Sequence, residues 1–221
     1  MQTFASPAPI SAVLQVAAGR VRFIAADRAD TVVEVRPADP AKGRDVRCAE
    51  QTRVEYADGT LRIHTPQEAN RLVGPSGSLE VTVQLPAGSR IEAKAASAEL
   101  RGVGRLGDVV FDGAYRHIKI DEAASVRLTA VDGDVEIGRL GGPATISTAR
   151  GDIRITEAVR GTLELRTQSG DITLGAAAGV SAALDAHTGL GRINNSLKND
   201  GTAGLDIHAT TSHGDITARS L

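Results

Sequence analysis

A short phrase, Gly-Asp followed by Val or Ile, recurs through the second half of the chain at a spacing of about eighteen residues. The full copies begin at Gly133, Gly151, Gly170 and Gly214, and Gly191-Arg192-Ile193 is a degenerate copy. A unit this short cannot bury an apolar face alone and must stack on its neighbours. The phrase therefore predicts a chain coiled on itself in regular layers.

The apolar residue that ends each phrase belongs to a longer column. Its members are Leu100, Ile118, Val135, Ile153, Ile172, Ile193 and Ile216, with separations of 18, 17, 18, 19, 21 and 23 residues. Several are followed two positions later by a second apolar residue, and residues i and i+2 share one face of a strand. Another apolar pair, such as Ala144 and Ile146, lies seven and five residues before the next Gly. Each unit is therefore predicted to run strand, turn, strand, turn.

These patterns predict an all-β fold: a parallel β-helix, or β-solenoid, formed by a single chain. The right-handed preference of parallel crossovers favours a right-handed coil. Residues 87–221 are expected to form six or seven repeats, and residues 1–86 an all-β amino-terminal cap of about six strands, the whole being one continuous unit. The best helical candidate, residues 66–72, is short. Extra residues of the longer repeats should lie in turns, around 176–181 and 197–202, because an insertion within a strand would reverse its inward face.

Composition excludes several functional classes. The chain has no Trp, two Tyr and three Phe, and its net charge is −2, so nucleic-acid binding and sugar-stacking platforms are both disfavoured. Cys48 alone forms no internal disulfide and is expected to be a small apolar side chain in or beside a strand. Neither a signal peptide nor a membrane-spanning apolar run is found. The expectation is a cytoplasmic protein without direct membrane insertion.

The Asp residues of the repeated phrase allow two interpretations. Asp134, Asp152 and Asp171 should stack at about 4.8 Å, where like charges repel unless amides or cations compensate them. Either each carboxylate accepts backbone N–H bonds at its turn, or the three form a strip that binds a cation or a basic partner. The calcium-binding nonapeptide signature is absent, so no metal or cofactor is predicted.

The repeats contain two further groups of polar residues, one of Thr and one of His. The column Thr148, Thr167, Thr188 and Thr211 is expected to pair hydroxyls and fix the register. The histidines His187, His208 and His213 fall in different columns, which disfavours a shared metal. No motif of a nucleophile elbow, phosphate loop or dinucleotide site is present, so no catalytic residue is predicted and the protein is expected not to be an enzyme.

Along nearly its whole length the chain resembles a bacterial domain family of unknown function, the putative adhesins with a β-strand repeat, in an actinobacterial form. The resemblance rests on residues 19–26, 31–36 and 79–88 and on the Gly-Asp-Ile/Val units. It implies a β-solenoid fold and supplies no catalytic residues.

The predicted function is a non-enzymatic structural or interaction module that binds a protein or itself rather than a small molecule. One alternative is a self-assembling scaffold like the β-helical bactofilins, pairing through an uncovered last coil at residues 216–221. The other is a carbohydrate-active β-helix enzyme, whose candidate residues would be the same three Asp.

Overall fold

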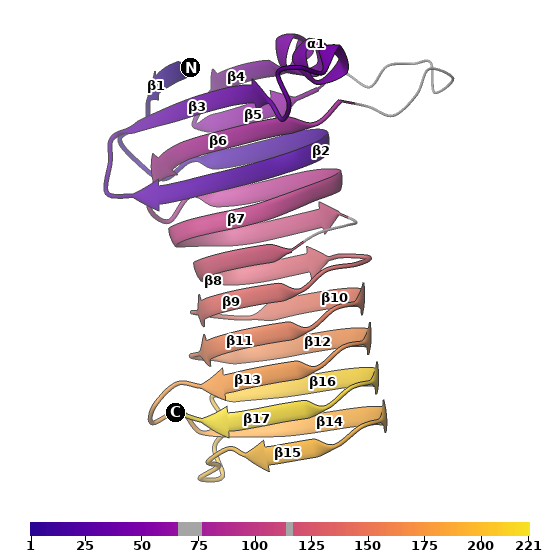
Figure 1. The fold of residues 1–221 in the computed structure, drawn as a ribbon. Helices are drawn as coiled ribbons and strands as arrows, with labels where there is room; N and C mark the ends of the chain where they lie inside the picture. The colour runs from indigo at the N-terminus through magenta and orange to yellow at the C-terminus, as the bar shows by residue number, and fades with distance from the viewer. Residues whose placement is uncertain (66–76, 114–116) are drawn as a thin grey trace.

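The computed structural model describes residues 1–65, 77–113 and 117–221, and these fold into one elongated stack of β-coils (Figure 1). In these ranges a single sheet of 17 strands winds around the stack, accompanied by one helix, so the all-β prediction is confirmed. The amino-terminal elements are β1 (Gln2–Ala5), β2 (Ser11–Ala26), β3 (Asp30–Pro37), α1 (Gly43–Gln51), β4 (Arg53–Ala57), β5 (Thr60–His64) and β6 (Leu79–Pro86). The long strands β7 (Arg90–Gly113) and β8 (Ile118–Thr129) follow.

The carboxyl-terminal coils each contain two short strands. They are β9 (Val135–Leu140), β10 (Ala144–Arg150), β11 (Ile153–Ala158), β12 (Gly161–Ser169), β13 (Ile172–Ala176), β14 (Ala182–Leu190), β15 (Ile193–Ser196), β16 (Leu205–His213) and β17 (Ile216–Ser220). The odd-numbered strands stack in one parallel face and the even-numbered strands in the other. This alternation is the predicted strand-turn-strand-turn unit.

The inward column is the one that the sequence predicts. Val135, Ile153 and Ile172 lie side by side in parallel register, and Leu100 and Ile118 precede them. Each of these side chains is at most 2% exposed. Because successive residues of a strand point to opposite faces, one branched aliphatic residue at every second position fills the narrow core without large rings.

The last two coils stack in an order that differs from their order in the chain. The strand β16 pairs with β12 on one side and β14 on the other, and β17 lies likewise between β13 and β15. The final coil is therefore inserted, and the coil β14–β15 forms the end of the stack (Figure 1). The expectation that residues 216–221 form an uncovered edge is wrong: Ile216 and Ala218 are buried between two neighbouring strands.

The two long turns carry the chain past this insertion. Residues 177–181 lead from β13 across the position of the inserted coil to β14, and residues 197–204 lead back from β15 to β16. Gly204 N–H donates to Ser181 C=O at 3.0 Å where the two connections meet. The prediction that the extra residues lie in turns near 176–181 and 197–202 is confirmed.

The amino-terminal region continues the stack. The strand β2 runs parallel to β5, β6 and β7, while β1–β3, β3–β6 and β4–β5 are antiparallel pairs. One cluster of buried apolar side chains extends from Ile10 to Ile216. The boundary at residue 86 and the right-handed path stay predictions.

Helix α1 departs from the prediction of an all-β cap. Its Asp45 is 3% exposed and accepts the Ser78 N–H at 3.0 Å, which ties the first turn of the helix to the start of β6. A carboxylate in a first turn also interacts favourably with the helix dipole. Cys48 is a small buried side chain of the core, as predicted, but it lies in this helix rather than within a strand. The helical candidate at residues 66–72 lies outside the described residues.

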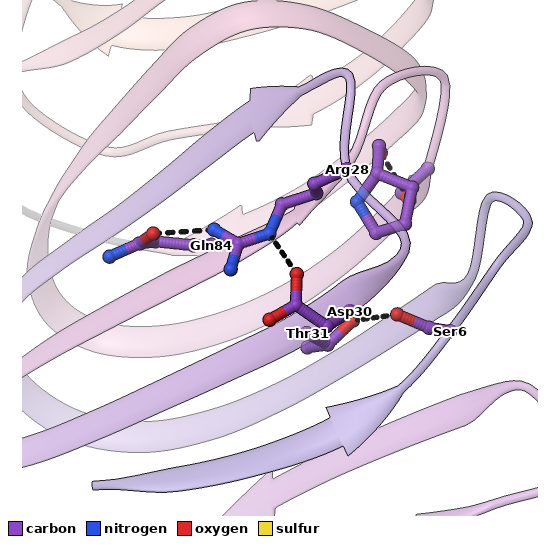
Figure 2. A network of polar contacts seen from close by, with 7 residues as sticks. Ser6, Arg28, Asp30, Thr31 and Gln84 are labelled. Atoms are coloured by element: carbon purple, nitrogen blue, oxygen red, sulfur yellow. Dashed lines mark hydrogen bonds and ion pairs between the residues drawn. The ribbon is translucent and has the colours of Figure 1, made fainter.

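Polar side chains fasten the turn between β2 and β3 (Figure 2). Arg28 Nε donates to Asp30 Oδ1 at 2.9 Å, and Arg28 Nη1 donates to Gln84 Oε1 on β6. The hydrogen bond from Arg28 lowers the pKa of Asp30 below its ordinary value. The buried hydroxyls of Ser6 and Thr31 lie 2.8 Å apart and join the turn after β1 to β3. These contacts hold the turn after β1, the strand β3 and the strand β6 together, so the network has a structural role.

Candidate functional site

The glycines of the repeated phrase occupy a corner where successive backbones nearly touch. Gly151 and Gly170 have φ of +126° and +152°, a region that other residues rarely adopt. A Cβ on Gly170 would lie 2.1 Å from Gly151 O, and one on Gly214 would lie 2.1 Å from Gly170 O. The glycines are thus required by close backbone packing.

The Asp side chains beside these glycines form a continuous hydrogen-bonded ladder. Asp134 Oδ1 accepts the Asp152 N–H at 2.9 Å, and Asp152 Oδ1 accepts the Asp171 N–H at 2.8 Å. Asp171 Oδ1 then accepts the Asp215 N–H at 2.7 Å, which follows the spatial order of the coils rather than the chain order. Each carboxylate joins its coil to the next.

The ladder ends at Arg192 in the last coil of the stack. Asp215 Oδ1 accepts the Arg192 N–H at 2.8 Å, and Asp215 Oδ2 lies 3.0 Å from the Arg192 guanidinium. The backbone N–H and then the side chain of Arg192 lower the pKa of Asp215. In the described part of the chain no further coil stacks here, so position 192 needs no acceptor for a neighbouring N–H. Arg192 takes the place of the Asp, and its positive charge neutralises Asp215.

The structure therefore places Asp134, Asp152 and Asp171 in one row, where each accepts a backbone N–H from the next coil rather than from its own turn. Within the described residues no group of three or more His, Cys, Asp or Glu side chains is arranged to hold a metal ion. Binding by the row as an acidic strip stays a prediction.

Removing one carboxylate from this ladder should weaken the stack measurably. We expect Asp171→Ala to lower the free energy of unfolding by about 1–2 kcal/mol, because the Asp215 N–H loses a charged acceptor. Asp171→Asn keeps an acceptor oxygen and should cost less. Urea unfolding monitored by circular dichroism measures both values.

The matched control is Asp206→Ala, since Asp206 is exposed on β16 and its side chain makes no hydrogen bond or ion pair among the described residues. Its replacement should change the unfolding free energy by less than about 0.5 kcal/mol. Equal effects of the two Ala substitutions would contradict a structural role for the ladder.

The Thr column stacks as predicted, but its hydroxyls bond differently. The order in space is Thr148, Thr167, Thr211 and Thr188. Thr167 Oγ1 donates to Gly151 O at 3.1 Å, and Thr211 Oγ1 donates to Gly170 O at 3.0 Å. The prediction of paired hydroxyls is wrong, because Thr167, Thr188 and Thr211 donate instead to corner carbonyls of the neighbouring coil.

The histidines lie in separate columns, as expected. His208 is opposite Glu164 and Asp185, His187 is opposite Thr210, and His213 is opposite Ser169 and Leu190. The His208 Nδ1 atom lies 3.5 Å from Asp185 Oδ2.

The two outward faces of the carboxyl-terminal coils differ in how their charges are compensated. On the face of β9 and β11, Glu136 lies 2.7 Å from Lys119 and 3.6 Å from Arg154. Lys119 lowers the pKa of Glu136 through a hydrogen bond. On the same face, Arg139 lies 3.4 Å from Glu122 and 3.3 Å from Glu157. These charges are already paired within the chain.

The opposite surface, which we call the β10–β12–β16 face, presents hydroxyls and charges with few internal partners. Its exposed side chains are Thr145, Ser147, Thr162, Glu164, Arg166, Asp206, His208 and Thr210. Among the described residues, Glu164, Arg166 and Asp206 make no ion pair within 4.0 Å, and His208 contacts Asp185. Such charges can pair with a partner without first breaking an internal salt bridge.

Comparison with known proteins shows the family to which this chain belongs. The family model described as Toastrack DUF4097 matches residues 13–220. The chain belongs to this family. The resemblance noted in the sequence is thereby confirmed, and the Toastrack model spans both the amino-terminal region and the Gly-Asp repeats.

A solved structure of low sequence identity has the same fold. A crystal structure of a putative adhesin from Bacteroides fragilis has a TM-score of 0.53 and 15% identity, covering 98% of this Toastrack chain and 95% of its own. A putative cell adhesion protein from Clostridium sporogenes has a TM-score of 0.37 and 12% identity, covering 100% and 98%. No curated protein matches.

The sequence interpretation missed the β10–β12–β16 face. The signal was present, because Glu164 and Arg166 alternate with the inward residues of a predicted strand in this Toastrack chain. What could not be seen was which outward charges find partners on neighbouring coils. Among the described residues, no helix is long and apolar enough to cross a bilayer, since α1 has nine residues.

Proposed function

We propose that this chain is a non-enzymatic, adhesin-like module that binds another protein through the β10–β12–β16 face. The observation that carries the proposal is the contrast between the two outward faces. Both stand on the same rigid coils, yet the β9–β11 charges are paired internally and Glu164 and Arg166 are not. Protein interfaces use such hydroxyls and charges to fix orientation and specificity.

Membership of the Toastrack family and the likeness to the putative adhesin from Bacteroides fragilis support this class of function. The rigid backbone supports it too, because a surface held by stacked strands loses little conformational entropy on binding. The ligand is a protein surface with complementary charges.

The test compares two double variants that remove equal charge from the two faces. Glu164→Ala/Arg166→Ala changes the proposed face, and Glu136→Ala/Arg154→Ala changes the control face. Immobilised wild-type protein is used to capture and crosslink partners from cells that produce it, and each variant is then assayed with the purified partner. We expect the first variant to weaken binding by about tenfold and the control to leave it within about twofold.

Equal binding by both variants would contradict the assigned face. The enzyme alternative is tested in parallel with a panel of acidic and neutral glycans. Turnover that disappears when Asp134, Asp152 and Asp171 are replaced by Asn would contradict the non-enzymatic proposal. Each of these carboxylates already accepts a backbone N–H, so no geometric observation favours the enzyme.

A further inference from the structure

The coil β14–β15 leaves part of the end of the apolar core uncovered. Within the described residues β14 pairs only with β16 and β15 only with β17. Leu184 and Ala186 are partly exposed at inward positions, and Ile193 is 44% exposed although its column is otherwise buried. The loop after β15 covers part of this end: Leu197 packs partly buried against the core, and Ala182 N–H donates to Lys198 C=O at 2.9 Å at the start of β14.

The open edge of β14 also presents backbone hydrogen-bonding groups. In a parallel strand, the N–H and C=O of alternate residues point toward opposite neighbours. At the start of β14, Leu205 N–H of β16 donates to Ser181 C=O, whereas Ala182 N–H donates to Lys198 C=O on the loop. By alternation, Asp185 and His187 direct their backbone groups to β16, and Leu184 and Ala186 direct theirs to the open side, where they are available to another strand.

The charges on β14 are complementary to those of a second copy of the same strand. An antiparallel pair centred on Ala186 places Asp185 opposite the second copy's His187, and the two-fold symmetry repeats this contact. A pair centred on Asp185 would place two carboxylates opposite each other. A pair centred on His187 would place two imidazoles opposite each other.

The column beside the edge continues the same alternation of charge. Glu164, His208 and Asp185 follow one another across β12, β16 and β14. The second copy's His187 would extend this series of acid, base, acid by another base. The register centred on Ala186 is thus favoured by the edge itself and by the column that leads to it.

We propose that two copies of this chain associate end to end through antiparallel pairing of β14 strands centred on Ala186. The pairing satisfies the open backbone groups and brings the uncovered core ends, including Leu184 and Ile193, against their symmetry mates. The contact is isologous and uses the only core end provided by β14–β15, so it closes at a dimer. This inference is independent of the proposed function, because the β10–β12–β16 face remains accessible in the dimer.

The test is sedimentation equilibrium of the wild-type chain and three variants over a range of concentrations. His187→Glu places two like-charge pairs in the interface and should raise the dimer dissociation constant by about tenfold. The double variant Asp185→His/His187→Asp exchanges the charges and restores both pairs across the interface, but it replaces the Asp185–His208 contact with two imidazoles. It should therefore recover most, not all, of the tenfold loss. Thr145→Glu adds the same charge on exposed β10, away from the edge, and should change nothing.

Circular dichroism confirms that each variant is folded, and the exchanged double variant distinguishes lost pairing from lost folding. A wild-type chain that stays monomeric at millimolar concentration would overturn the proposal. So would open-ended polymers, or a dimer that His187→Glu leaves intact. The variant Glu164→Ala/Arg166→Ala should still form the dimer. This result would show that dimer formation does not depend on the face proposed to bind a partner.

Discussion

Replacing Gly170 with Ala should lower the free energy of unfolding by about 3 kcal/mol or more. The added Cβ would lie 2.1 Å from Gly151 O, while φ of +152° is itself unfavourable for an L side chain. The neighbouring atom belongs to the backbone of a packed coil and cannot move aside as a flexible side chain would. Urea denaturation with two-state analysis measures the loss.

Gly179→Ala is the matched control because it separates the two causes. Gly179 has φ of +79°, also positive, but an added Cβ there meets no atom within 4 Å. It should cost only the conformational strain, about 1 kcal/mol. If the two substitutions were equally destabilising, close packing of the corner could not explain the glycine column.

The same corner shows which features of the fold the sequence could predict. The positions of Val135, Ile153 and Ile172 predict their register, because a slip by one residue would turn every apolar side chain outward. The turn role of Asp152 was likewise among the predicted alternatives. Its donor, the amide of the following coil, could not be deduced, since an Asp beside Gly usually bonds within its own turn.

The order of the last coils was harder to predict, because every unit offers its neighbours nearly the same pairing edge. Three signals in the sequence nevertheless indicated it. Asn195 occupies an inward position that is apolar in the other coils, Arg192 replaces the Asp of the ladder, and the two longest connections flank this unit. Each of these three features suits a coil at the end of a stack, because no further coil covers its outer side.

Helix α1 was missed for a different reason. It is nine residues long and follows Asp39 and Pro40, which the sequence marks as a turn. Short helices in proteins depend on tertiary contacts more than on propensity. The contact that matters here, from Asp45 to Ser78 N–H, joins residues 33 apart in the chain.

The inserted coil makes a prediction that a sequential solenoid does not share. In a Cys48→Ala background, the pair Glu164→Cys and His208→Cys should form a disulfide under mild oxidation, because the two positions are direct neighbours on β12 and β16. The pair Glu164→Cys and Asp185→Cys should crosslink at least about tenfold less. Two strand spacings, about 9.6 Å, separate β12 from β14, and disulfides rarely bridge Cα atoms more than about 7 Å apart.

The pair Asp185→Cys and His208→Cys is the internal control, since β14 and β16 are neighbours whichever of them lies nearer to β12. It should crosslink in either arrangement and thus reports that the variants fold and oxidise normally. Preferential crosslinking of positions 164 and 185 would contradict the insertion. Burial favours the inserted order. This order encloses Leu205, Ile207 and Ile216 on both sides, and it leaves the Asn195 amide exposed to solvent at the end of the core. Exchanging the two coils would bury that amide among aliphatic side chains and expose residues that are now at most 1% accessible.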